Sequence, residues 1–176
     1  AGLAFVPEDR RKQGLVMDLS VARNTALTLR SKLARCGLIN SRTERAVAQE
    51  WSTNLEVKTA SQDTPVSALS GGKQQKVVLA KWLATDPKIL IVDEPTRGID
   101  VGAKDEIYTL LEELAKQGKA IIVISSELPE VLRLANRIAV MAHGRIIGTL
   151  DNEEATQENI MELATVGQEE ANGVHA

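Results

Sequence analysis

Residues 69–75 read Leu-Ser-Gly-Gly-Lys-Gln-Gln, and residues 89–95 read Ile-Leu-Ile-Val-Asp-Glu-Pro. The two glycines of the first stretch let the backbone approach a ligand closely. The apolar helix predicted after them points its N-terminal N–H groups and positive dipole end at the same place. Ser70 adds a hydroxyl donor, so the stretch predicts one side of a phosphate site. Taken alone, it is equally well explained as a serine-capped turn before a helix, because short glycine motifs recur by chance.

The second stretch predicts a strand of a parallel sheet that ends in two acids. Its continuous apolar run is typical of a strand buried on both faces. Ligands of open parallel sheets bind beyond the carboxyl ends of the strands, where Asp93 and Glu94 fall. Because neighbouring residues on a strand point in opposite directions, one acid is free to hold Mg²⁺ through water while the other addresses the attacking water. The alternative is a strand that simply ends in a polar turn.

Hydrophobic periodicity predicts strands and helices in alternation, as in a parallel α/β fold. Strands are expected at residues 1–7, 88–93 and 120–124, with a hairpin around His143-Gly144. Helices are expected from the N-cap Ser20 as far as Leu33, and over residues 42–55, 77–83, 101–117, 129–135 and 157–164. The chain is therefore expected to form one domain over residues 1–165, with a helical subdomain over 18–84 and a mobile tail over 166–176.

The composition excludes several classes of protein. Of the 176 residues, 43% are hydrophobic and 26% are charged, as is typical of a folded globular protein. The net charge of -3 and the scarcity of aromatic residues argue against a nucleic-acid partner, which needs a basic surface or a stacking platform. Cys36 is the single cysteine, which excludes an internal disulfide and a cysteine-rich zinc site. No apolar run approaches the ~18 residues of a membrane helix, so direct membrane insertion is not expected.

The order of the motifs resembles that of a known family. A Leu-Ser-Gly-Gly signature, an apolar helix and an acid-tipped strand follow one another in the ATP-binding cassette (ABC) ATPases, which have a P-loop NTPase-like α/β fold. In that family the Asp-Glu pair closes the Walker B strand. Residues 96–104, which read Thr-Arg-Gly-Ile-Asp-Val-Gly-Ala-Lys, and the pair Gln74-Gln75 are similar to the second cassette of fused two-cassette importers of ribose, galactose or xylose. The likeness covers residues 2–165.

The resemblance implies two cassettes paired head to tail with ATP between them. Four signature residues would contact the γ-phosphate of ATP held by the partner cassette: Ser70, Gly71, Gly72 and Gln74. At the chain's own site, Asp93 would hold Mg²⁺ through water and Glu94 would be the catalytic residue that polarises water. Asp100 falls at the D-loop, which communicates between cassettes.

The same resemblance implies a place and partners for the protein. It would lie in the cytoplasm, on the inner face of the membrane, as the ATP-hydrolysing subunit of a sugar importer. ATP binding and hydrolysis would drive a membrane permease between its orientations. The permease would dock near the groove between the Q-loop region and the helical segment 20–57.

Three departures from the family pattern accompany these likenesses. The sequence contains no Gly-x-x-x-x-Gly-Lys-[Ser/Thr] phosphate loop and begins, without Met, inside a predicted strand. We therefore expect the chain to be the C-terminal part of a longer protein and to be inactive in ATP hydrolysis by itself. We also expect it to be poorly soluble by itself, because apolar sheet surface would stay uncovered.

Glu8 stands at the Q-loop position, where the family has glutamine, and Ser126 stands at the position of the switch histidine. A hydroxyl bonds a phosphate oxygen but does not supply an imidazole's proton chemistry.

Two other functions compete with the importer ATPase. Glu8 and Ser126 favour a non-catalytic regulatory or interaction module with a degenerate cassette, whereas the intact Walker B acids and signature favour the ATPase. A cassette ATPase that acts on ribosomes or DNA is disfavoured by the acidic charge balance. Arg97 is equally consistent with a contact to the partner cassette and with a solvated loop arginine.

Overall fold

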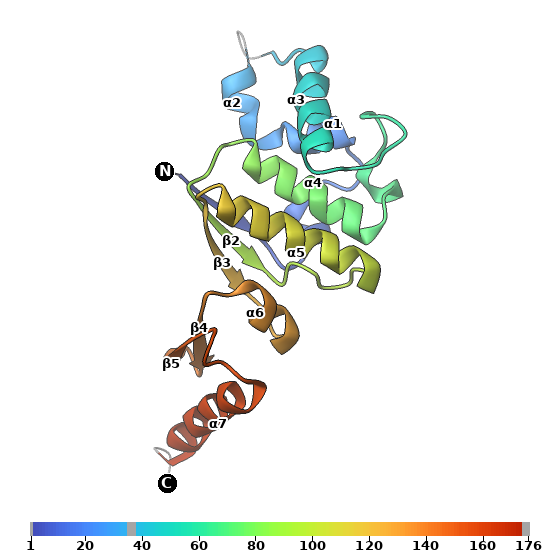
Figure 1. The fold of residues 1–176 in the computed structure, drawn as a ribbon. Helices are drawn as coiled ribbons and strands as arrows, with labels where there is room; N and C mark the ends of the chain where they lie inside the picture. Colours follow the sequence, from blue (N-terminus) through green and yellow to red (C-terminus); the bar gives the residue numbers. More distant parts are fainter. Residues whose placement is uncertain (1, 35–37, 174–176) are drawn as a thin grey trace. The chain divides into compact units, whose positions relative to one another are not determined.

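The structure is a computed structural model that describes residues 2–34 and 38–173. The chain divides into two compact units, Ala1–Ile124 and Ser125–Ala176. Figure 1 shows both ribbons, and each unit is considered by itself. Cys36 lies outside the described residues. The expected domain over 1–165 and its helical subdomain over 18–84 stay predictions.

A three-stranded parallel sheet forms the centre of the N-terminal unit, as the sequence predicts. Its strands are β1 (Leu3–Val6), β2 (Ile89–Asp93) and β3 (Ala120–Ile124), and they lie in the order β1-β2-β3. The chain reaches β2 from β1 through the long helical segment, and it reaches β3 from β2 through helix α5 (Val101–Lys116). The carboxyl ends of all three strands therefore meet at one edge.

The expectation that these strands are buried on both faces is wrong. Alternate residues of β1 and β2 that share one face are at most 1% exposed: Ala4, Val6, Leu90 and Val92. On the opposite face Ile91 is half-buried, and the other large apolar side chains are 38–52% exposed: Leu3, Phe5, Ile89, Ile122 and Ile124. Helices α4 (Gly71–Leu83) and α5 lie side by side on the first face, and no helix among the described residues of this unit covers the second (Figure 1).

The helical segment begins with a π-helical turn, η1 (Arg10–Gly14), which Asp9 caps. The single helix expected after Ser20 is broken into three pieces: α1 (Val21–Thr25), η2 (Leu27–Leu29) and α2 (Arg30–Leu33). The break falls where Thr28 Oγ1 donates to the main-chain carbonyl of Lys81 in α4 at 2.5 Å, a tertiary bond that no local pattern predicts. Helix α3 (Ser41–Asn54) and the 3-10 turn η3 (Val66–Ala68) then lead to α4.

The C-terminal unit has its own small core. Helix α6 (Leu128–Leu134) precedes a hairpin of β4 (Arg137–Ala142) and β5 (Arg145–Asp151), and helix α7 (Gln157–Gly173) follows. The predicted hairpin is confirmed, with positive φ at His143 and Gly144 as a type I′ turn requires. Ile138, Val140 and Ile160 form the core of this unit.

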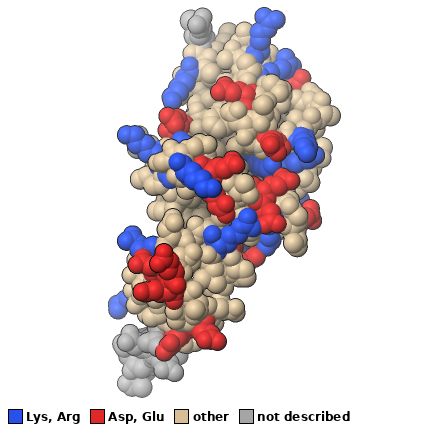
Figure 2. Space-filling view, in the orientation of Figure 1, with Lys and Arg blue, Asp and Glu red and all other residues tan. Residues whose placement is uncertain are grey.

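Helix α7 is longer than the predicted 157–164, so much of the segment expected to be a tail continues a helix. Residues 174–176 lie outside the described part. Among the described residues, no helix is both long and apolar enough to cross a bilayer. Figure 2 shows acidic and basic side chains interspersed over the face in view, in keeping with 21 basic and 24 acidic residues.

Candidate functional site

The N-terminus of α4 carries a serine that does not cap its helix. Ser70 occupies the N-cap position and is exposed, yet its side chain accepts no bond from the first turn. Elsewhere in the same unit the caps are made: Ser20 accepts from Arg23 N at 3.3 Å, and Asn40 accepts from Arg42 N at 2.8 Å. The first-turn N–H groups of α4, at the positive end of its dipole, are thus not served by the residue best placed to satisfy them.

The signature is held close against the β2–α5 loop, which we define as residues 94–100. A Cβ at Gly71 would lie 2.9 Å from the carbonyl oxygen of Gly98, and one at Gly72 would lie 2.9 Å from the Ala103 Cβ. Real Cβ atoms essentially never approach so closely, so both positions require glycine. The contact brings the start of α4 beside the start of α5, whose N-cap residue is Asp100.

Asp100, like Ser70, occupies the N-cap position of a helix without capping it through its side chain. It is exposed, and its side chain accepts no cap bond from α5, although its carbonyl accepts from Ala103 N and Lys104 N. Two adjacent helices of 13 and 16 residues therefore begin with polar residues that leave their first turns to another acceptor. This pair of helix N-termini suits an anion such as a phosphate group.

The two acids lie at the carboxyl end of β2, as predicted. Asp93 is in register with Ile124 of β3, and Glu94 N donates to the Ile124 carbonyl at 2.8 Å. Glu94 has φ 45°, a left-handed backbone conformation that non-glycine residues rarely adopt. Such strain, of order 1–3 kcal/mol, clusters at functional sites. Both side chains are half-buried at this edge.

The described residues include no group of three or more His, Cys, Asp and Glu side chains placed to hold a metal ion. Mg²⁺ is usually bound by one or two carboxylates together with waters and phosphate oxygens rather than by an all-protein cage. Asp93 and Glu94 fit that kind of site, because both offer hard carboxylate oxygens at the same strand end.

Gln74 does not lie where the sequence led us to expect. Its side chain is buried, 1% exposed, and its amide nitrogen donates to the carbonyls of Val66 and Leu69 at 3.1 and 3.0 Å. In this structure Gln74 has no surface to offer to ATP. It instead fixes the turn that leads into the signature, which is a role that the motif alone does not reveal.

Glu8, at the Q-loop position, forms an ion pair with Arg97 of the β2–α5 loop. Arg97 thus has a partner within its own unit, and its contact with a partner cassette stays a prediction. Beside it lies a hollow of about 330 Å³ lined by residues 8–11, Arg97 and Gly98. Ser126, at the switch position, is the second residue of the C-terminal unit and follows β3 along the chain.

Arg10 is a residue of this region that sequence reasoning missed. Its guanidinium donates to the carbonyls of Arg97 and Gly98 at 2.7 and 3.0 Å, and its Nε donates to Gln74 Oε1 at 3.5 Å. Burial lowers the pKa of Arg10, with a smaller effect in the same direction from neighbouring Arg11. The acceptors lie 64 to 88 residues away in sequence, so no local signal could have pointed to them.

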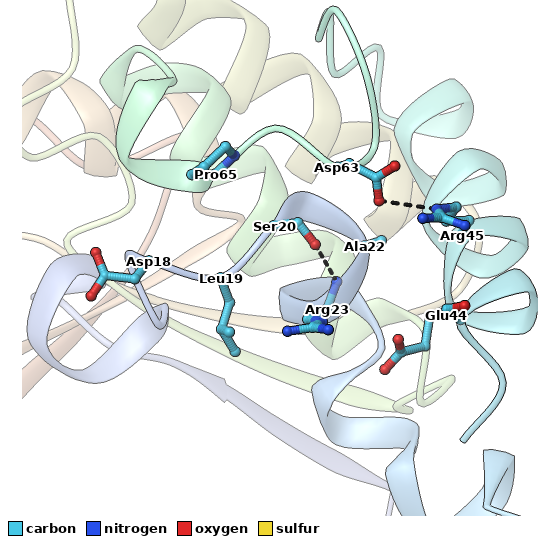
Figure 3. Close-up of a pocket in the computed structure, with 10 residues that line it drawn as sticks. Asp18, Leu19, Ser20, Ala22, Arg23, Glu44, Arg45, Asp63 and Pro65 are labelled. Carbon is cyan, nitrogen blue, oxygen red and sulfur yellow. Dashed lines mark hydrogen bonds and ion pairs between the residues drawn. The ribbon is translucent and has the colours of Figure 1, made fainter. Parts of the chain in front are cut away.

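A second cavity, of about 270 Å³, lies within the helical segment (Figure 3). Charged side chains of both signs line it, and Arg45 Nε donates to Asp63 Oδ1 at 2.9 Å on its rim. Asp18, Arg23 and Glu44 face the same space. Glu8 lines the other hollow, and the expected groove between the Q-loop region and segment 20–57 stays a prediction.

Residues 2–97 match the family model of the ABC transporter. The chain belongs to the ABC transporter family. It is 56% identical, over 165 residues, to the ribose import ATP-binding protein RbsA of Rhodococcus jostii (strain RHA1). That alignment covers 94% of this chain and 33% of the relative. It is 52% identical over 168 residues to the ribose import ATP-binding protein RbsA of Lactococcus lactis subsp. cremoris (strain SK11), covering 96% and 34%. The chain thus spans about a third of the length of the curated relatives it matches.

Solved structures confirm the expected ABC ATPase fold. The dimeric structure of a post-hydrolysis state of the ATP-binding cassette MJ0796 bound to ADP and Pi aligns with a TM-score of 0.70 and 26% identity. The alignment covers 85% of this chain and 62% of that cassette. The predicted α/β cassette with a parallel sheet is therefore confirmed for this member of the ABC transporter family.

Proposed function

We propose that this chain is part of the ATP-hydrolysing subunit of an ABC importer for ribose or a similar monosaccharide. The observation that carries the proposal is the uncapped N-terminus of α4 at the signature, beside the equally uncapped start of α5. Ribose is proposed as the imported sugar because the relatives are ribose import ATP-binding proteins. The proposal includes the finer points of a fused pair of cassettes and a cytoplasmic position on the inner face of the membrane.

The signature would complete the ATP site of a partner cassette. Ser70, exposed and not engaged in capping, would donate its hydroxyl to the γ-phosphate, and the first-turn N–H groups from Gly71 onward would donate beside it. These donors are fixed by the helix, so they need little reorganisation when charge builds up on the transferred phosphoryl group. Asp100, at the start of α5, would face the partner from the same edge.

The Walker B acids would serve the chain's own nucleotide site. Mg²⁺, when bound with ATP, supplies charge neutralisation between the phosphate oxygens. Asp93 would hold the ion through water, while Glu94 would accept a hydrogen bond from the attacking water and take up its proton. Glu94 directly follows the last residue of β2, and its φ is 45°.

The charged cavity of Figure 3 is the place that we propose for the permease. It lies on the helical segment, and its mixture of acids and arginines suits a polar loop of a membrane protein. Closure of the two cassettes on ATP would move this segment, and release after hydrolysis would return it.

The test is sugar uptake by the polypeptide that carries these residues, reconstituted with its permease and Mg·ATP. Glu94→Gln removes the proton acceptor, and we expect hydrolysis at the chain's own nucleotide site, and ribose uptake with it, to fall by at least about 100-fold while nucleotide binding and turnover at the partner cassette's site persist. Glu50→Gln, the same change on the exposed face of α3, should leave both unchanged. Normal uptake by the Glu94 variant would instead favour the non-catalytic module. Uptake of galactose or xylose but not ribose by the unmodified protein would show that the proposed sugar is wrong.

A further inference from the structure

Arg10 ties together three segments that are far apart in the sequence. It lies in η1, directly after the Q-loop position, and it contacts both the β2–α5 loop and the signature helix. One guanidinium nitrogen donates to Arg97 O at 2.7 Å, the other donates to Gly98 O at 3.0 Å, and Nε points at Gln74 Oε1 at 3.5 Å. Two of these acceptors are main-chain carbonyls, so the contact fixes the backbone of the loop rather than one mobile side chain.

The signature leaves room for this guanidinium. A Cβ on Gly71 would lie 2.9 Å from Arg10 Nη2, the same nitrogen that donates to Gly98. Gly98 itself has φ 64°, which turns its carbonyl into the position where Arg10 meets it. The first signature glycine is therefore needed for the arginine contact as well as for any approach of a ligand.

A second contact joins the Q-loop region to the β2–α5 loop, and here the Q-loop region supplies the acid and the loop supplies the arginine. Glu8 pairs with the side chain of Arg97, while Arg10 bonds the carbonyl of that residue. Single exposed ion pairs contribute little to stability, but a network of charges with fixed geometry does more. The acid at the Q-loop position is thus held by the loop that leads to the D-loop aspartate.

We propose that Arg10 is a positioning residue that makes the Q-loop region, the β2–α5 loop and the signature move as one body. The inference rests on the proposed function, since the surfaces that it aligns are those offered to the partner cassette. Without Arg10, the start of α4 and the loop before Asp100 would move independently, and the closed arrangement on ATP would form less often.

The geometry requires arginine and not merely a positive charge. A guanidinium presents several donors in a planar fork, whereas a lysine ammonium is a single point charge on a flexible stem. Arg10→Lys therefore keeps the charge and loses the simultaneous contacts. The control is Arg11→Gln, because Arg11 is the exposed neighbour in η1 and its backbone N–H, which the substitution keeps, is bonded to Asp9.

The first measurement is amide hydrogen exchange in the polypeptide that carries these residues. Gln74 N bonds Ser70 O at 2.9 Å in the signature helix, and Ile99 N bonds Thr96 O at 3.1 Å in the loop. In Arg10→Gln we expect exchange at both amides to accelerate by about tenfold, the size of one charged hydrogen bond. Amides of α3 should not change, and neither should any amide in the Arg11 control. Unchanged exchange, or acceleration at only one of the two amides, would overturn the proposal.

The second measurement is ATP hydrolysis with the partner cassette present. Arg10→Gln and Arg10→Lys should both lower kcat by about tenfold with KM for ATP within about twofold, because the site assembles less often while the partner's nucleotide binding is intact. Full activity of the lysine variant would overturn the positioning role. Absence of hydrolysis in the unmodified protein would refute the proposed function instead, and the exchange experiment would still decide on Arg10.

Discussion

Replacing Gly71 by alanine tests the close contact between the signature and the β2–α5 loop. The new Cβ would lie 2.9 Å from Gly98 O and 2.9 Å from Arg10 Nη2, so the guanidinium must leave and the loop must shift. Charged hydrogen bonds are worth about 1.5–3 kcal/mol each, and we halve that value because these lie near solvent. Against this loss, alanine gains up to about 1 kcal/mol of helix propensity over glycine. The expected net change is a loss of about 1–2 kcal/mol of unfolding free energy.

Gly102→Ala is the matched control. Gly102 lies in the first turn of the neighbouring helix, and a Cβ there would meet no atom within 4 Å. This variant should gain about 0.5–1 kcal/mol, the ordinary benefit of alanine over glycine in a helix. The assay is urea unfolding of the 176-residue chain followed by tryptophan fluorescence, since Trp51 and Trp82 both lie in the N-terminal unit. A Gly71 variant as stable as the Gly102 variant would refute the described contact.

Three further predictions concern stability. Leu79→Ala, at a side chain that is 0% exposed, should cost about 2–5 kcal/mol in urea unfolding, whereas Val101→Ala, at 82% exposed, should cost almost nothing. A hydrogen bond from the buried Lys76 lowers the pKa of the exposed Glu106 below its ordinary 4.5. The pair therefore adds stability above pH 4.5 and loses it on acidification, and Glu106→Gln should flatten that loss in acid titrations. Burial lowers the pKa of Lys81 from its ordinary 10.5, so the unfolded chain binds more protons than the folded one and stability rises towards pH 10.5. Lys81→Met should abolish this rise, and an unchanged slope of the unfolding free energy against pH would contradict the prediction.

The sequence predicted the parts of the fold that depend on short-range pattern. The apolar run before Asp93 and Glu94 indicated β2, and the glycine signature indicated that a helix follows it, because both are written in consecutive residues; α4 nevertheless begins at Gly71, earlier than the predicted residues 77–83. The hairpin at His143 was likewise predictable, since a type I′ turn needs particular residues at particular places. The burial of these strands on one face only was not predictable, because a continuous apolar run does not say which face its own chain covers.

The site was predicted as a set of positions rather than as contacts. The family resemblance implied that Gln74 contacts the γ-phosphate of the partner's ATP, whereas in the structure its side chain is buried and bonded to Val66 and Leu69. Arg10 gave no signal at all, since its importance lies in carbonyls of another segment. Residues of one motif are recognisable by spacing, but side chains that join separate motifs are revealed only once the fold brings those motifs together.

The central claim is that the signature of this chain acts on ATP bound by a partner cassette. The most direct measurement is ATP hydrolysis by the paired cassettes with Glu94→Gln already present, so that turnover comes from the site which the signature completes. Adding Ser70→Arg should lower that turnover by at least about 100-fold, the effect of losing a donor to the transition state. Ser67→Arg, at an exposed serine of η3, should leave it unchanged. Equal turnover in the two serine variants would contradict the account.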